Sequence, residues 1–127
     1  MNDGNRNQLV KSSEIEWKPL GEENAEGIYI KSLLFDEEAR RSPTFLLKFE
    51  PGASYPLHNH PAGEEVFVLE GAVKFGKDEL KAGDYLFTAP GNMHRVSTDV
   101  GCVLLLKVQQ EVEIIKPRTA VGNGNGS

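Results

Sequence analysis

The chain consists of short β-forming runs separated by Gly and Pro, and this pattern is the strongest constraint on its fold. Such runs recur at a spacing of roughly ten residues, which is typical of β-sandwiches and β-barrels. The only segment with helical character is short, at residues 36–40. We therefore predict an all-β protein. The expected strands cover residues 27–35, 44–50, 66–69, 72–75, 84–88 and 102–110. Gly71 is expected to close the strand at residues 66–69 and so separate it from the next one.

The length of 127 residues indicates one domain. We predict that residues 17–118 form this domain. Residues 1–16 are mostly polar and residues 119–127 are rich in Gly and Asn, so we expect a flexible N-terminal arm and a flexible C-terminal tail.

Charge and apolar content argue against two kinds of partner. The formal net charge is -5, so the basic surface of a nucleic-acid-binding protein is not expected. The longest apolar run, residues 102–106, is far too short to cross a bilayer, and the N-terminus lacks a signal-peptide pattern. The one cysteine, Cys102, has no internal disulfide partner and is expected as a small buried apolar residue. We predict a cytoplasmic protein.

Several expected strands are apolar on both faces. In residues 44–50 and 102–108, both alternating sets of side chains include large apolar residues. A strand with one face in water should instead alternate between apolar and polar residues. We predict a homodimer, in which a second subunit covers the outer face. The alternative is a cover within the chain, from the N-terminal segment that contains Trp17 and Leu20.

Two of the three histidines lie one residue apart in the stretch HNHPAGEEVFVLEG, residues 58–71. Alternate residues of a strand share a side, so His58 and His60 should project together. Imidazole is the commonest metal ligand in proteins, and a carboxylate is its natural complement. Glu64 and Glu65 both follow, and periodicity does not choose between them because both sides of this strand are apolar. The third histidine, His94, would join the pair if its strand lies beside theirs.

This stretch resembles the first motif of the cupin superfamily. Its six-residue interval to the final glycine selects Glu64 over Glu65, which the resemblance leaves beside the site or on the surface. The first motif is matched without a gap by Gly52, His58, His60, Glu64 and Gly71. The second motif is matched at Gly83, Gly91 and His94, with a proline displaced by one position.

Within the cupins, the chain is most similar to the cupin domain of ChrR-type anti-sigma factors and to small standalone relatives, over about residues 17–110. The resemblance implies a double-stranded β-helix, the jelly-roll β-barrel of the cupins. It also implies one divalent metal ion per chain. Three nitrogens and one oxygen suit Fe, Mn, Zn, Ni or Co, and the sequence does not distinguish these metals. The implied ligands are His58, His60, Glu64 and His94.

The resemblance leaves two functions open. One is a small metalloenzyme of dioxygenase, isomerase or decarboxylase type that acts on a small organic molecule in the barrel. The other is a ChrR-like sensing or binding module without catalysis. The ligands alone do not decide between them, because reaction type depends on the residues of the pocket. No catalytic residue is assigned from the sequence. Candidates for the pocket wall are Tyr55, Phe87, Met93 and Arg95.

Overall fold

The computed structural model describes residues 6–36, 41–59 and 61–108. Apart from one 3-10 turn, the regular secondary structure of these residues is all β-strand, which confirms the predicted all-β class. Of the predicted helical segment, residues 37–40 lie outside the described part, and Asp36 ends a strand. In the same part, no helix is long and apolar enough to cross a membrane. The elements are η1 (Ser12–Glu14), β1 (Lys18–Pro19), β2 (Ile28–Asp36), β3 (Arg41–Phe49), β4 (Ser54–Asn59), β5 (Glu64–Phe75), β6 (Asp78–Lys81), β7 (Tyr85–Thr88), β8 (Met93–Ser97) and β9 (Cys102–Val108).

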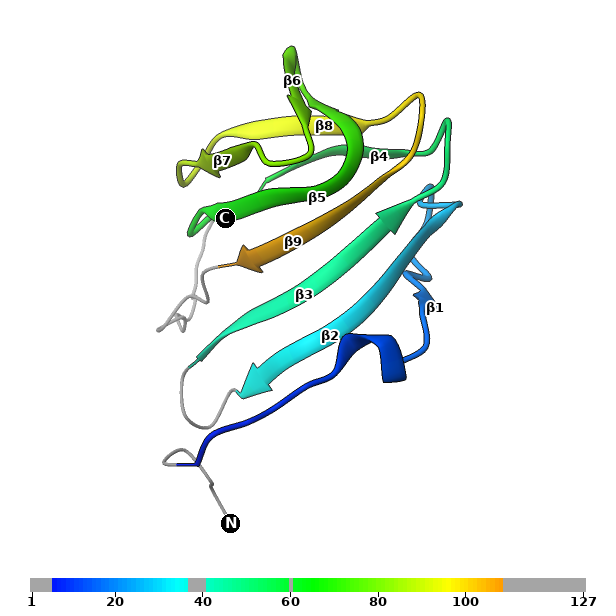
Figure 1. The fold of residues 1–127 in the computed structure, drawn as a ribbon. Helices are drawn as coiled ribbons and strands as arrows, with labels where there is room; N and C mark the ends of the chain where they lie inside the picture. The colour runs from blue at the N-terminus through cyan, green and yellow to red at the C-terminus, as the bar shows by residue number, and fades with distance from the viewer. Residues whose placement is uncertain (1–5, 37–40, 60, 109–127) are drawn as a thin grey trace.

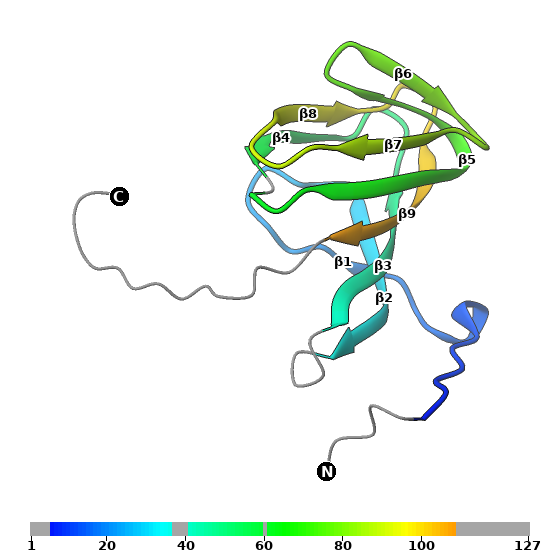
Figure 2. The ribbon, with the colours of Figure 1, turned by 90° about the vertical axis from the view of Figure 1, so that its left-hand side faces the viewer.

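The strands form one antiparallel sheet in the order β1-β2-β3-β9-β5-β8-β4, with β6 and β7 also paired to β5. The last strand of the described residues, β9, lies between β3 and β5, so it joins the two halves of the sheet (Figure 1). In the turned view, β4, β5, β7 and β8 run across the picture and β2 and β3 run down it (Figure 2). The sheet is therefore curled, and its inner face encloses the core.

The core lies on the inner face because side chains alternate along each strand. In β5, Val66 and Val68 point inward and are fully buried, whereas Phe67 and Leu69 between and after them are 39% and 41% exposed. Leu104 of β9 is opposite Val68 and is also buried. Burial of each such side chain contributes about 1.5–3 kcal/mol. The inner row thus holds the two halves of the sheet together.

The N-terminal segment covers part of the outer face. Lys31 of β2 and Lys48 of β3 place their Nζ atoms 4.8 and 4.9 Å from the centre of the Trp17 ring. The Lys31 ammonium also donates a hydrogen bond to the Ser12 carbonyl oxygen at 2.6 Å. Internal cover, the alternative to a second subunit, therefore accounts for the outer face of β2 and β3. It leaves the outer face of β5 and β7 exposed.

The predicted end of a strand at Gly71 is wrong. β5 continues through Gly71 to Phe75, and its register with β9 shifts between Val68 and Glu70. Gly71 has φ of +79°, and a Cβ built on it would lie 2.0 Å from the Gly101 carbonyl oxygen. A glycine in a strand permits a bulge and a close approach of another backbone, which is the situation here. The strand bends at Gly71 instead of ending.

The predicted domain limits at residues 17 and 118 remain a prediction. The expected C-terminal tail, residues 119–127, lies outside the described residues.

Candidate metal centre

Two histidines from neighbouring strands meet inside the curled sheet. His58 of β4 and His94 of β8 are directly opposite each other in an antiparallel pair, so their side chains lie on the same face. Their rings are 5.0 Å apart, centre to centre, in an edge-to-face arrangement. The condition stated from the sequence, that the strand of His94 lies beside that of His58, is therefore met. His60 lies outside the described residues, so its place in the site remains a prediction.

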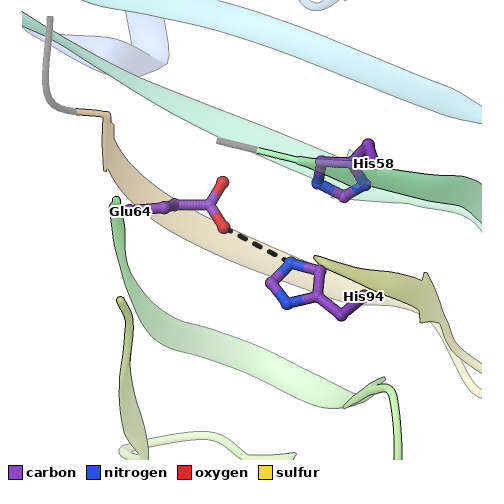
Figure 3. Close-up of side chains that lie close together, drawn as sticks. All are labelled: His58, Glu64 and His94. Carbon is purple, nitrogen blue, oxygen red and sulfur yellow. Dashed lines mark ion pairs between the residues drawn. The ribbon is translucent and has the colours of Figure 1, made fainter. Parts of the chain in front are cut away.

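Glu64 brings a carboxylate to the two histidines from the first position of β5. Its side chain is 4% exposed, and Oε1 lies 3.6 Å from Nε2 of His94 (Figure 3). Gly63, immediately before it, has φ of +96°, and a Cβ there would come within 3.1 Å of the Thr88 carbonyl oxygen. A glycine at this position therefore lets the chain enter β5 close to β7 with the Glu64 side chain pointing inward.

The rival carboxylate, Glu65, points the other way. It shares the outer face of β5 with Phe67, and its Oε1 accepts a hydrogen bond from the Tyr85 hydroxyl at 2.8 Å. This bond raises the pKa of Tyr85, because removing its proton would place two negative charges together. The sequence could not decide between the two parities of this strand. Its folded form places Glu64, and not Glu65, beside the histidines.

Neighbouring groups fix the orientation of both rings. Nδ1 of His58 lies 2.9 Å from the carbonyl oxygen of Pro56. Since a carbonyl only accepts, Nδ1 carries the proton and donates it, which leaves the Nε2 lone pair for another partner. A histidine ligand commonly donates its second N–H to a backbone carbonyl, and the contact of His58 with Pro56 has this arrangement. The Phe75 ring packs edge-to-face on the His94 ring at 5.1 Å.

The described donor atoms fit a divalent metal ion. One donor atom from each of His58, Glu64 and His94 lies within 4.8 Å of the others. Two donors held about 2.1 Å from one ion would be roughly 3–3.4 Å apart, close to the 3.6 Å between Glu64 and His94. Two imidazoles and one carboxylate also suit the borderline transition metals better than Mg²⁺ or Ca²⁺, which prefer oxygen ligands. Three donors leave further coordination positions open on a four- to six-coordinate ion.

A cavity of about 200 Å³ reaches the centre from the inner face of the sheet. Its wall is mostly apolar, with polar groups from His58, Glu64, Tyr55 and Glu22. The Tyr55 ring is 4.7 Å from the His58 ring, and the Tyr55 hydroxyl donates a hydrogen bond to Oε1 of Glu22. Partial burial, followed by this bond to Glu22, raises the pKa of Tyr55 to about 12. The remaining lining residues are Leu20, Ile30, Phe45, Leu47, Phe49, Phe75, Val96, Leu104 and Leu106.

Of the four residues that the sequence offered for the pocket wall, Tyr55 lines this cavity. Phe87 and Met93 are 51% and 58% exposed. Glu22 was missed, because it stands in a polar stretch that reads as an ordinary surface loop. Cys102 is buried, as expected, and burial raises the pKa of its thiol to about 11, which makes a reactive thiolate unfavourable at neutral pH.

A curled antiparallel sheet with a His/Glu cluster on its inner face is the arrangement that the resemblance to cupins implied. The model of one family, the ChrR cupin-like domain, matches residues 5–112. The chain belongs to this family, and the resemblance to cupins inferred from the motif spacing is confirmed.

Proteins that are similar to the chain in sequence or in structure include a plant repair/toleration protein, a bacterial dioxygenase and an anti-sigma factor. The DNA damage-repair/toleration protein DRT102 of Arabidopsis thaliana is 36% identical over 64 residues; the match covers 45% of this chain and 21% of that protein. An acetylacetone dioxygenase from Acinetobacter johnsonii has a TM-score of 0.75 and 21% identity, over 82% of this chain and 74% of its own. The structure of the anti-sigma factor ChrR in complex with SigE of Rhodobacter sphaeroides has a TM-score of 0.64 and 24% identity. This match covers 78% of the present chain and 51% of the chain in that structure. The chain thus spans about a fifth of its curated relative, and the structural matches share its fold.

Proposed function

We propose that the chain is a small metalloenzyme, in which His58, His60, Glu64 and His94 hold one divalent transition-metal ion next to a cavity for a small organic molecule. The main supporting observation is that His58 and Glu64 line this mostly apolar cavity. Apolar pockets with a few convergent polar groups are typical of small-molecule sites. A volume of about 200 Å³ favours a ligand smaller than a drug-sized molecule.

The chain's own residues would bind, orient and shield such a ligand. The bound metal ion would supply Lewis acidity to a ligand oxygen, or electrons in a dioxygenase reaction. The apolar wall excludes water and so strengthens electrostatic interactions within the cavity. The Pro56 carbonyl keeps the proton on Nδ1 of His58, away from the donor cluster. Dioxygenase, isomerase and decarboxylase reactions all remain compatible with this arrangement.

Metal analysis combined with oxygen uptake tests the enzymatic proposal. We expect protein purified without added metal to contain about one divalent transition-metal ion per chain, since four such ligands bind one ion. Iron or manganese, together with oxygen consumed with at least one member of a panel of small diones and catechols, would make the enzyme a dioxygenase. Tightly held zinc and no turnover would contradict the dioxygenase form of the proposal.

The second candidate is a ChrR-like sensing or regulatory module without catalysis. The match to the ChrR cupin-like domain family favours it. In this case the metal would hold the barrel in one state and a small ligand would change that state. Zinc in a closed, four-coordinate site would favour this reading, because catalytic sites keep an open position.

Glu64→Gln is expected to reduce metal content well below that of Glu65→Gln. The first change removes a negative charge from the donor cluster, whereas the second affects only the outward carboxylate that accepts from Tyr85. We expect at least about a tenfold loss of metal affinity for Glu64→Gln and nearly none for Glu65→Gln. Competition with a chelator, followed by elemental analysis, measures both. The reverse order would mean that the wrong carboxylate has been assigned.

We further propose that the chain is a homodimer formed through the outer face of β5 and β7. The apolar side chains on this face are large and exposed: Phe67, Leu69, Tyr85 and Phe87 are 39%, 41%, 56% and 51% exposed. Because Phe67 is opposite Tyr85 across the two strands, these side chains form one patch. Contiguous exposed apolar patches commonly mark protein interfaces, and two-fold symmetry is the commonest arrangement.

Light scattering at micromolar concentration is expected to give twice the chain mass of 14.0 kDa. Phe67→Ser should shift the protein toward the monomer, because it removes apolar area from the centre of the patch. Val100→Ser is the matched control: Val100 is 66% exposed but lies outside β5 and β7, so the change should leave the mass as it is. A monomeric wild-type protein would refute the dimer.

A further inference from the structure

The charge of the cavity wall is one-sided. Among the described residues that line it, Glu22 and Glu64 are acidic, and neither Lys nor Arg is present. Glu64 belongs to the donor cluster, where a metal ion would balance its charge. Glu22 comes from the segment between β1 and β2 and has no place in that cluster. Its charge therefore acts on whatever else occupies the cavity.

Glu22 stands where the cavity meets the solvent. It is exposed and yet lines the cavity, whereas His58 and Glu64 line it from the interior. Tyr55 spans the two ends, because its ring contacts the His58 ring and its hydroxyl donates to Oε1 of Glu22. A carboxylate offers about four acceptor positions, so one bond from Tyr55 leaves acceptor capacity for a ligand. The apolar wall between the ends offers a ligand no other charged contact.

We propose that Glu22, positioned by Tyr55, selects the ligand by charge. The preferred ligand is a small, mainly apolar molecule whose end remote from the histidines carries a hydrogen-bond donor, such as a hydroxyl or an ammonium group. Molecules that carry an anionic group at this end are rejected. This inference rests on the proposed function only in placing the ligand in this cavity.

The selection has an electrostatic basis. An anion next to Glu22 would meet a like charge, and the described wall has no cation to compensate for its lost hydration. A hydroxyl or ammonium group would instead donate to the carboxylate, and a charge-assisted hydrogen bond is about twice as strong as a neutral one. Specificity of this kind combines an attractive contact with a repulsive one. Both effects come from the same side chain here.

Three matched probes test the selection without relying on metal chelation: 2-phenylethylamine, 2-phenylethanol and phenylacetate. Calorimetry on the full chain, with metal content measured in parallel, gives the affinity of each. We expect the amine and the alcohol to bind, and phenylacetate to bind at least about tenfold more weakly than the amine. Equal binding of amine and acid, or binding of none of the three, would overturn the inference.

Variants then assign the selection to Glu22. Glu22→Gln keeps an acceptor for Tyr55 but removes the charge, so the amine-to-acid ratio should fall to within about threefold at unchanged metal content. Tyr55→Phe keeps the ring on His58 but removes the hydroxyl that positions Glu22, so the ratio should fall part of the way. Glu23→Gln is the matched control, since Glu23 does not line the cavity, and it should preserve the ratio.

An unchanged ratio in Glu22→Gln, or an equal fall in Glu23→Gln, would overturn the inference. The proposed function fails by a different measurement, the absence of bound metal from the wild-type protein. If the chain holds no metal but the probes rank as expected and Glu22→Gln abolishes the ranking, the charge selection stands and the metalloenzyme does not.

Discussion

Gly71→Ala is expected to lower the free energy of unfolding by about 3–5 kcal/mol, which is a large part of the stability of a domain of this size. The new Cβ would lie 2.0 Å from the Gly101 carbonyl oxygen and 2.9 Å from Cα of Cys102, so backbone would have to move. The positive φ of +79° adds strain, because alanine disfavours it. Equilibrium unfolding in urea, with the slope checked for constancy, measures the loss.

Gly83→Ala separates the two causes. Gly83 also has a positive φ, +94°, but a Cβ there would have nothing within 4 Å. It should therefore show the conformational cost alone, roughly 1–2 kcal/mol. If both variants lost the same stability, the close approach to Gly101 would not matter.

The bend at Gly71 links the fold to the candidate metal centre. β5 begins with Glu64 in the donor cluster and ends with Phe75, whose ring packs on His94. On the other side of the bend, the buried Thr98 hydroxyl donates to the Ala72 carbonyl oxygen at 2.6 Å and accepts from the Gly101 N–H at 2.9 Å. β5 therefore supplies a donor atom at its first residue, Glu64, and packs on His94 with its last residue, Phe75. The bend at Gly71 lies between these two residues.

The β class could be predicted from the sequence because short β-forming runs bounded by Gly and Pro are a local signal. The end of the third run was mispredicted for the same local reason. A glycine inside a strand pattern reads equally well as a stop or as a bulge. What decides between a stop and a bulge is the position of Gly101, thirty residues further along the chain. Gly101 immediately precedes β9, and the pairing of Cys102 with Gly71 brings the Gly101 backbone close to Gly71.

The choice between Glu64 and Glu65 shows what periodicity lacks. An apolar outer face around Phe67 and Leu69 makes both parities look buried. Motif spacing selected Glu64, and the structure places this residue in the cluster. Glu22 could not be found in this way, because its contact with Tyr55 spans 33 residues and depends on the curl of the sheet. The candidate ligands His58 and Glu64 belong to one short motif, whereas the cavity mouth is assembled from distant segments.

His58→Ala and His94→Ala are each expected to abolish stoichiometric metal binding. Each change removes one imidazole donor from a set of at most three histidines, so the loss should exceed the roughly 10–100-fold typical of removing a residue that only supports a ligand. Elemental analysis after dialysis against a weak chelator measures the metal retained per chain. Circular dichroism on the same samples checks that the sheet is intact, which matters most for His94 because Phe75 packs on it.

Asn59→Ala is the matched control for these two changes. Asn59 lies next to His58 on β4, where alternation places its side chain on the opposite face of the strand. It should therefore retain the full metal content, while the histidine variants lose it with their sheet preserved. Full metal retention in both histidine variants would refute the site, and with it the metalloenzyme. Metal loss in Asn59→Ala as well would indicate that any disturbance of β4 releases the ion, so the assignment to the imidazoles would fail.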